Sequence, residues 1–531
     1  MAEQKPLLIT DLPTEIIEAI VERIPIDTIP AVRLACRAFT GPATEQLFYN
    51  LYIRFNDQHV LGRPSARMLG LAQSIRLLHL RPIACECSEC RGFKSQAASL
   101  VGPGRALELL KERSGRKIRA FHVFAPGAHL YPTDSTWLAT LLSTYPTISS
   151  LTMPLATKTL RWAEFRAALL QLRSLSYLSL NFEYTPRNEE RTTIADVQPI
   201  WDLLAANADT LRTLRLTLIT RLGGPNDRDD PTGMMPAYNI LTESQDDLLA
   251  PPGGWPWRAP LNLRNFKLSR YATRQCQINA NGYFLNPQTV ESIILIDSWQ
   301  VIDMISPPEK FTNLRSLQIC HAAWASEIEE VLMKIRPLES LYLTLWRRDR
   351  GIRADAVMMH RQSLKVLWVD GGFARMVDGT PVRSVDQPGE RFEGDFTQFS
   401  VLEELAMRAW PKKSTQIKIP AQLKVLCTLR EVGGHRKHMT AATYAKSVDL
   451  MMLGQGQSAP ETEVPYPPVY IVMEIGYRAR ISDKTLMFLV RREDEISTLR
   501  QVHLEEAEEV VGKIRVVEGS IQPRWGRDDL P

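Results

Sequence analysis

Three stretches of the chain decide its fold: LRSLQI at residues 314–319, LESLYL at 338–343 and LKVLWV at 364–369. Each has apolar residues at its first, fourth and sixth positions, and the alternation at its end is typical of a short strand. They start 24 and 26 residues apart, within the period of repeat proteins that add one strand per unit. The stretches therefore predict a repeat array whose units bury their apolar positions against one another.

The same pattern recurs over a long part of the chain. Complete copies begin at residues 75, 118, 148, 175, 211, 263, 290, 314, 338, 364 and 402, and an incomplete copy begins at residue 423. Segments with apolar residues at helical spacing lie between several copies, at 136–145, 160–172, 197–206 and 325–335. A strand followed by a helix, repeated, predicts an α/β solenoid.

The solenoid is expected to occupy residues 70–429. It contains two insertions rich in Gly, Pro and Asp, at about 221–260 and 371–400. Residues 430–531 are expected to form a C-terminal cap or small α/β extension, with a strand at 469–475 and an acidic helix at 495–511.

Residues 7–55 predict a separate helical module. The apolar residues Leu12, Ile16, Ile17 and Ile20 recur at helical spacing, and a second helix is expected from Pro30 to the Gly41-Pro42 pair. So short a module cannot bury the apolar faces of both helices against each other. A docking surface for a partner is one explanation. The alternative is that these helices only cap the repeat domain.

The motif Leu12-Pro13-x-Glu15-Ile16-Ile17, followed by Leu34-x-Cys36-Arg37-x-Phe39, resembles an F-box. The resemblance covers residues 7–50, and the array behind it resembles the irregular leucine-rich repeats found behind many F-boxes. Phe39 replaces the more common tryptophan. The resemblance implies contact with a Skp-type adaptor through eight residues: Leu12, Pro13, Ile16, Ile17, Ile20, Leu34, Cys36 and Phe39.

Through that adaptor, the resemblance implies a place in a cullin–RING ubiquitin ligase as its substrate-recognition subunit. The F-box would hold the adaptor and the repeat face would hold a client protein, while the ubiquitin transfer belongs to the partners. No catalytic activity and no cofactor are expected of this chain. The alternative is an interaction scaffold whose repeats bind a partner without any ligase.

The client is expected on the concave face of the repeats. The central residue of each strand points there and neighbouring repeats stack, which places Arg215 beside Lys267 and Tyr342 beside Trp368. Aromatic and Arg side chains are enriched at protein interfaces. The candidate client-binding residues are Tyr177, Arg215, Lys267, Tyr342, Trp368, Asp370 and Arg408. A solvated face that binds no ligand is the alternative.

One cluster resembles a metal site: Cys85-x-Cys87-x-x-Cys90, with His79 upstream. Zinc sites take four ligands, usually as two spaced pairs, and the second pair is missing here. A cysteine-bearing loop is therefore favoured over zinc binding or redox sensing. The chain has no Gly-x-Ser-x-Gly, P-loop or His-Glu-x-x-His motif.

Composition narrows the class of protein further. The 531 residues include 64 Lys and Arg against 60 Asp and Glu, and a net charge of +4 is not typical of a nucleic-acid binder. No apolar run is long enough for a membrane span. Seven cysteines, an odd number, and the lack of any Asn-x-Ser/Thr site favour an intracellular location, in the cytoplasm or the nucleus.

Overall fold

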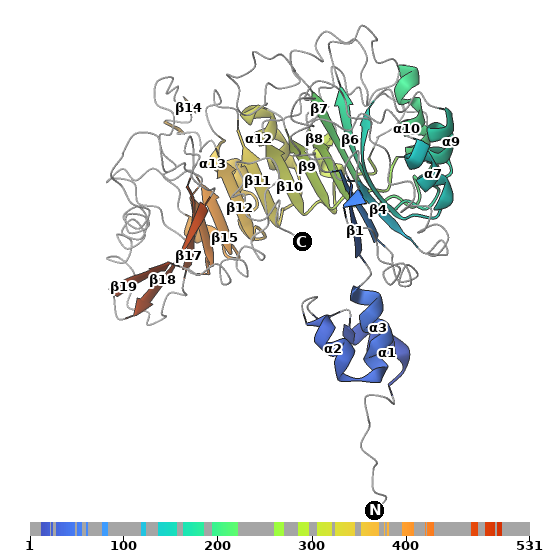
Figure 1. Cartoon of the computed structure of the whole chain (residues 1–531). Helices are drawn as coiled ribbons and strands as arrows, with labels where there is room; N and C mark the ends of the chain where they lie inside the picture. The colour runs from blue at the N-terminus through green and yellow to red at the C-terminus, as the bar shows by residue number, and fades with distance from the viewer. Residues whose placement is uncertain are drawn as a thin grey trace, which may run out of the picture. The chain divides into compact units, whose positions relative to one another are not determined.

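A computed structural model represents the protein (Figure 1). It describes residues 12–21, 23–24, 28–47, 50–55, 60–61, 77–82, 118–123, 136–156, 163–184, 194–220, 260–269, 285–296, 305–320, 324–345, 352–370, 376–377, 380–381, 396–407, 420, 422–428, 469–475, 484–493 and 496–501. The chain divides into two compact units. The first comprises Met1–Met234 and Pro256–Asn262, and the second comprises Met235–Trp255 and Leu263–Pro531.

Three short helices begin the first unit: α1 (Thr14–Val21), α2 (Ile29–Ala35) and α3 (Arg37–Leu47). They share a core of five buried apolar residues, namely Ile17, Val21, Ile29, Phe39 and Ala43. The helical module expected from the sequence is therefore present, and its helices pack on one another.

The second helix expected from the sequence is two helices. Cys36 is extended, with φ −152° and ψ 142°, and separates α2 from α3. The α3 helix then continues through Gly41 and Pro42, so the expected stop at this pair is wrong. Phe39 and Ala43 lie one turn apart and are both buried. Their burial offsets the hydrogen bond that the proline nitrogen cannot donate.

A parallel sheet follows this module in the first unit. Its neighbouring strands are, in order, β1 (Asn50–Phe55), β3 (Leu77–Pro82), β4 (Ala120–Val123), β5 (Ser150–Ala156), β6 (Tyr177–Tyr184) and β7 (Thr213–Thr220). A short strand, β2 (Val60–Leu61), pairs antiparallel with β1. The helices between the later strands are α7 (Thr136–Thr144), α9 (Ala163–Leu170) and α10 (Ile194–Ala206).

The second unit also contains a parallel sheet. Its neighbouring strands are β8 (Asn265–Ser269), β9 (Ser292–Ile296), β10 (Ser316–Cys320), β11 (Ser340–Thr344), β12 (Val366–Asp370), β15 (Glu404–Met407), β16 (Val425–Thr428) and β17 (Val469–Ile475). Two antiparallel strands follow, β18 (Lys484–Glu493) and β19 (Ile496–Gln501).

Short helices and one hairpin connect the strands of the second unit. The helices are η5 (Pro308–Lys310), α12 (Ala325–Lys334), α13 (Ala354–Met358) and η6 (Phe396–Gln398). The hairpin pairs β13 (Met376–Val377) with β14 (Thr380–Pro381).

This mixed α/β architecture confirms the predicted strands. Each copy of the apolar pattern coincides with one strand, from β3 to the incomplete copy at β16. Two assignments were wrong. Asn50–Phe55 belongs to the sheet and not to the helical module, because β1 pairs with β3 in parallel. The expected acidic helix begins instead with β19, where Leu499 pairs with Val490 of β18.

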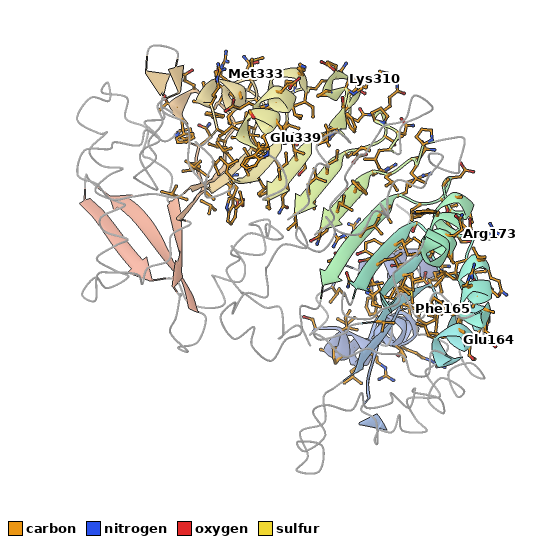
Figure 2. The ribbon with its side chains drawn as sticks, turned by 90° about the horizontal axis from the view of Figure 1, so that it is seen from above. Glu164, Phe165, Arg173, Lys310, Met333 and Glu339 are labelled. Atoms are coloured by element: carbon orange, nitrogen blue, oxygen red, sulfur yellow. The ribbon has the colours of Figure 1, made fainter. Side chains whose placement is uncertain are left out.

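Helices cover one face of the sheet in the first unit (Figure 1). The strand residues of that face are apolar and buried, for example Leu151 and Met153 in β5. On α9, Phe165 is buried whereas its neighbour Glu164 is exposed; both are labelled in Figure 2. The alternation of buried and half-exposed residues in β4 to β7 leaves a second, polar face.

A buried asparagine ties one repeat to the preceding one. Asn207 follows α10 and is only 1% exposed. Its Oδ1 accepts a hydrogen bond from the Leu175 backbone N–H at 2.9 Å, and its Nδ2 donates to the carbonyls of Leu172 and Leu203 at 2.8 Å each. One side chain thus satisfies three backbone groups that would otherwise be buried without partners.

His360 holds the equivalent place in the second unit, where its Nδ1 accepts from the Leu338 backbone N–H at 3.1 Å. Hydroxyl groups add a second link in three repeats. Thr210, Thr289 and Ser363 each donate to the carbonyl of the first apolar residue of the preceding copy, namely Leu175, Leu263 and Leu338. Side chains that precede each strand therefore close the turns of the array.

Among the helices that the structure describes, none combines the length and the apolar character that crossing a membrane requires.

Candidate interaction surfaces

Among its described residues, the N-terminal module exposes two large apolar side chains. Leu34, near the end of α2, is 86% exposed, and Ile16 in α1 is 48% exposed. Their neighbours Ile17 and Phe39 are buried in the module core, at 5% and 9%. Leu34 therefore lies outside the core of the module, on its surface.

The eight residues expected to touch an adaptor therefore fall into two groups. Pro13, Ile16 and Leu34 lie on the surface. Ile17 and Phe39 support the helices from inside. The remaining three, Leu12, Ile20 and Cys36, are partly buried and pack against the core.

The polar face of the first unit brings together four side chains from four strands. The Arg215 guanidinium carbon in β7 lies 5.6 Å from the centre of the Tyr177 ring in β6, which is a cation–π geometry. The Tyr177 and His122 ring centres are 6.3 Å apart, and His122 Nε2 is 3.3 Å from Ser150 Oγ. Tyr177 and Arg215, both candidate client-binding residues, are therefore in contact. Burial lowers the pKa of His122, which favours its neutral form.

The central residues of the strands in the second unit differ in exposure from those in the first unit. Tyr342 and Trp368 are neighbours, as expected, with ring centres 6.2 Å apart. They are only 5% and 2% exposed, however, so the expectation that they are open to a client is wrong. All five residues of β11 are buried, so both of its faces are covered. The pair contributes to the core of the second unit.

The structure does not test the expected contact of Arg215 with Lys267. Lys267 is half-buried in β8 and belongs to the second unit, whereas Arg215 belongs to the first. Asp370 ends β12, where its backbone pairs with Thr344. Arg408 lies outside the described residues. Tyr177 and Arg215 are therefore the predicted client residues that share a described surface.

The cysteine cluster lies beyond what the structure describes. Cys85, Cys87 and Cys90 are outside the described residues, and of His79 only the strand position in β3 is described. Within the described ranges, no group of three or more His, Cys, Asp or Glu side chains is arranged to hold a metal ion.

Sequence analysis missed an edge of alternating charge in the second unit. The residue after the first apolar position of each copy is, in order, Arg264, Glu291, Arg315, Glu339, Lys365, Glu403 and Lys424. Glu339 contacts two of its neighbours, Arg315 at 3.6 Å and Lys365 at 3.0 Å. Lys424 contacts Glu403 at 3.0 Å. The alternation of sign at this one position was the signal that could have revealed the edge.

Comparison with models of known families gives no match, and comparison with curated proteins gives no significant similarity.

Proposed function

We propose that this protein is the substrate-recognition subunit of a cullin–RING ubiquitin ligase. In this proposal the helices of residues 12–47 are an F-box that docks on a Skp-type adaptor, and the strand–helix units are leucine-rich repeats that hold a client. The observation that carries it is Leu34, which is 86% exposed although the residues around it form a closed core.

The energetics favour a partner over that surface. Full burial of a leucine or isoleucine side chain stabilises by about 1.5–3 kcal/mol. Covering Leu34 and Ile16 would therefore contribute several kcal/mol to binding, whereas Ile17 and Phe39 are already buried and contribute to the fold of the module. The docking residues proper are then Pro13, Ile16 and Leu34.

The polar strand face of the first unit, with Tyr177 and Arg215 in contact, is the candidate client surface. A receptor that holds adaptor and client on one chain makes the transfer step effectively intramolecular, which raises the local concentration of the client. No chemistry on this chain is then required.

The test is co-purification of the adaptor and the cullin with the full chain and with two variants. Leu34→Asp places a charge in the proposed contact. The control, Thr28→Asp, adds the same charge at the exposed start of the same helix, where an acidic residue suits the N-cap. We expect Thr28→Asp to retain both partners and Leu34→Asp to lose both.

Failure of the unaltered chain to retain an adaptor would contradict the proposal. The chain would then be an interaction scaffold whose N-terminal helices serve another purpose.

A further inference from the structure

Two exposed methionines lie in neighbouring repeats of the second unit. Met333, in the last turn of α12, is 50% exposed and is labelled in Figure 2. Met359, directly after α13, is 58% exposed. The strands that follow them, β11 and β12, pair in parallel. Exposed apolar side chains that occur singly are ordinary on a protein surface, whereas a group of them indicates a contact site.

The packing of His360 brings the two methionines to the same side of their repeats. Its Nδ1 accepts the Leu338 backbone N–H at 3.1 Å, and the Leu332 carbonyl also interacts with the ring. Leu332 directly precedes Met333, and His360 directly follows Met359. The turn after α13 therefore lies against the last turn of α12, and both methionines lie where the helices end and the strands begin.

Two arginines lie on the same connections. Arg336 lies between α12 and β11, Arg361 lies between α13 and β12, and both are exposed. Arg361 donates a hydrogen bond to the Met358 carbonyl at 3.3 Å. Within the described residues, no carboxylate forms an ion pair with either guanidinium. Two positive charges therefore accompany the two methionines.

The carboxylates nearby are engaged by other cations. Glu330 contacts Lys334 at 2.6 Å. Glu339 contacts both Arg315 and Lys365, so one negative charge already faces two positive charges. The connections that lead into β11 and β12 thus carry an excess of positive charge, which an acidic ligand would complement.

The side chains set the kind of ligand. A guanidinium binds a carboxylate through two parallel hydrogen bonds, and a methionine side chain adapts to apolar groups of different shape. Neighbouring strands are about 4.8 Å apart, and side chains one turn apart on a helix are about 5–6 Å apart at Cβ. A lipid surface is a poorer match, because peripheral proteins bind it through a much larger apolar face.

We propose that the surface formed by Met333, Arg336, Met359 and Arg361 binds an acidic helical segment of a partner protein. Two apolar side chains of the segment, one turn apart, contact the methionines, and carboxylates beside them contact the arginines. This surface is additional to the adaptor and client contacts proposed above and depends on neither.

The test measures binding of three fluorescein-labelled peptides to the full chain. They share an Ala-rich helical background. The first carries two Leu residues one turn apart with Glu residues beside them on the same face. The second has Gln in place of each Glu, and the third has Ser in place of each Leu. We expect the first peptide to bind at least about tenfold more tightly than either of the others.

Three protein variants locate the site. Arg336→Glu is expected to weaken binding of the first peptide by about tenfold or more. The control, Arg173→Glu, makes the same change at an exposed arginine between α9 and β6 (Figure 2), and is expected to change the affinity by less than about twofold. Met359→Ser should weaken the first peptide and leave the affinity of the third peptide unchanged.

Three results would overturn the inference. The first is no binding of the Leu and Glu peptide up to about 1 mM. The second is an equal loss of affinity in Arg336→Glu and Arg173→Glu. The third is binding of the full chain to phosphatidylserine vesicles that Arg336→Glu abolishes, which would assign the surface to a membrane instead. Adaptor co-purification is expected to be unchanged in all three variants, so this inference and the proposed function can fail separately.

Discussion

The backbone N–H of Leu338 donates a hydrogen bond to Nδ1 of His360, a residue 22 positions later in the chain, at 3.1 Å. His360 is 1% exposed. Burial lowers the pKa of its imidazole to about 4, against a smaller opposing effect of the Leu332 carbonyl. A neutral ring is required, because a protonated Nδ1 would present a second donor to the Leu338 N–H.

This contact predicts that the second unit loses stability in mild acid. The ordinary pKa of histidine is 6.5 and the folded value is about 4, so the unfolded chain binds the proton first. The contribution of His360 to the free energy of unfolding is complete above about pH 6.5 and falls as the pH drops toward 4. Between about pH 7.5 and about pH 5 we expect a loss of about 2 kcal/mol, measured by urea unfolding.

The matched variant for that experiment is His360→Asn. Its amide oxygen can still accept from Leu338, as Asn207 does in the first unit, but it does not titrate. The variant should lack the part of the pH dependence of unfolding that His360 contributes. An identical slope in both proteins would show that His360 is not the group responsible.

Asn207 is expected to be among the most sensitive polar positions of the first unit. Replacing it with Ala removes three hydrogen bonds and leaves buried backbone groups unpaired, which should cost about 2–4 kcal/mol. Asn207→Asp keeps the acceptor for Leu175 but loses both donated bonds. Unfolding curves that match those of the unaltered chain would contradict this role.

The charged edge predicts a salt-dependent effect at Glu339. Glu339→Lys places a cation between Arg315 and Lys365, and we expect about 1 kcal/mol of lost stability at low salt. The loss should shrink near 1 M salt, where the screening length is about 3 Å. Adding Lys365→Glu to this variant should recover part of it. A loss that is unchanged by salt would indicate disturbed packing instead.

The N-terminal module predicts opposite outcomes for two adjacent isoleucines. Ile17→Asp buries a charge in the module core and should unfold α1 to α3, whereas Ile16→Asp should leave the fold intact because its side chain is 48% exposed. Hydrogen exchange of the amides in 14–47 distinguishes the two variants. Equal protection in both would mean that the core is assigned wrongly.

The strands could be predicted from sequence because one simple pattern governs them. Apolar residues that alternate along a strand and recur from repeat to repeat can be buried in few other ways, and β8 to β12 follow the pattern closely. The helices over 136–145 and 325–335 were predicted for the same reason, since α7 and α12 have a clear apolar face.

What could not be predicted depends on contacts distant in sequence. The helix α3 continues through Gly41-Pro42, where Phe39 and Ala43 pack into a core shared with α1 and α2, and this packing overrides the usual stop signal. Burial of Trp368 depends on what covers the second face of β12, which no local pattern encodes. The side chains that close the turns, Asn207 and His360, lie a few residues before a strand, in front of β7 and β12. Consensus patterns of such repeats place the turn-closing residue just after a strand.

The most direct test of the account is the affinity of a purified Skp-type adaptor for the full chain and for Leu34→Asp, measured by calorimetry. We expect micromolar or tighter binding to the unaltered chain and at least about a hundredfold weaker binding to Leu34→Asp. Unfolding of the two proteins should be the same, because Leu34 lies outside the module core. Equal affinities, or no binding by the unaltered chain, would contradict it.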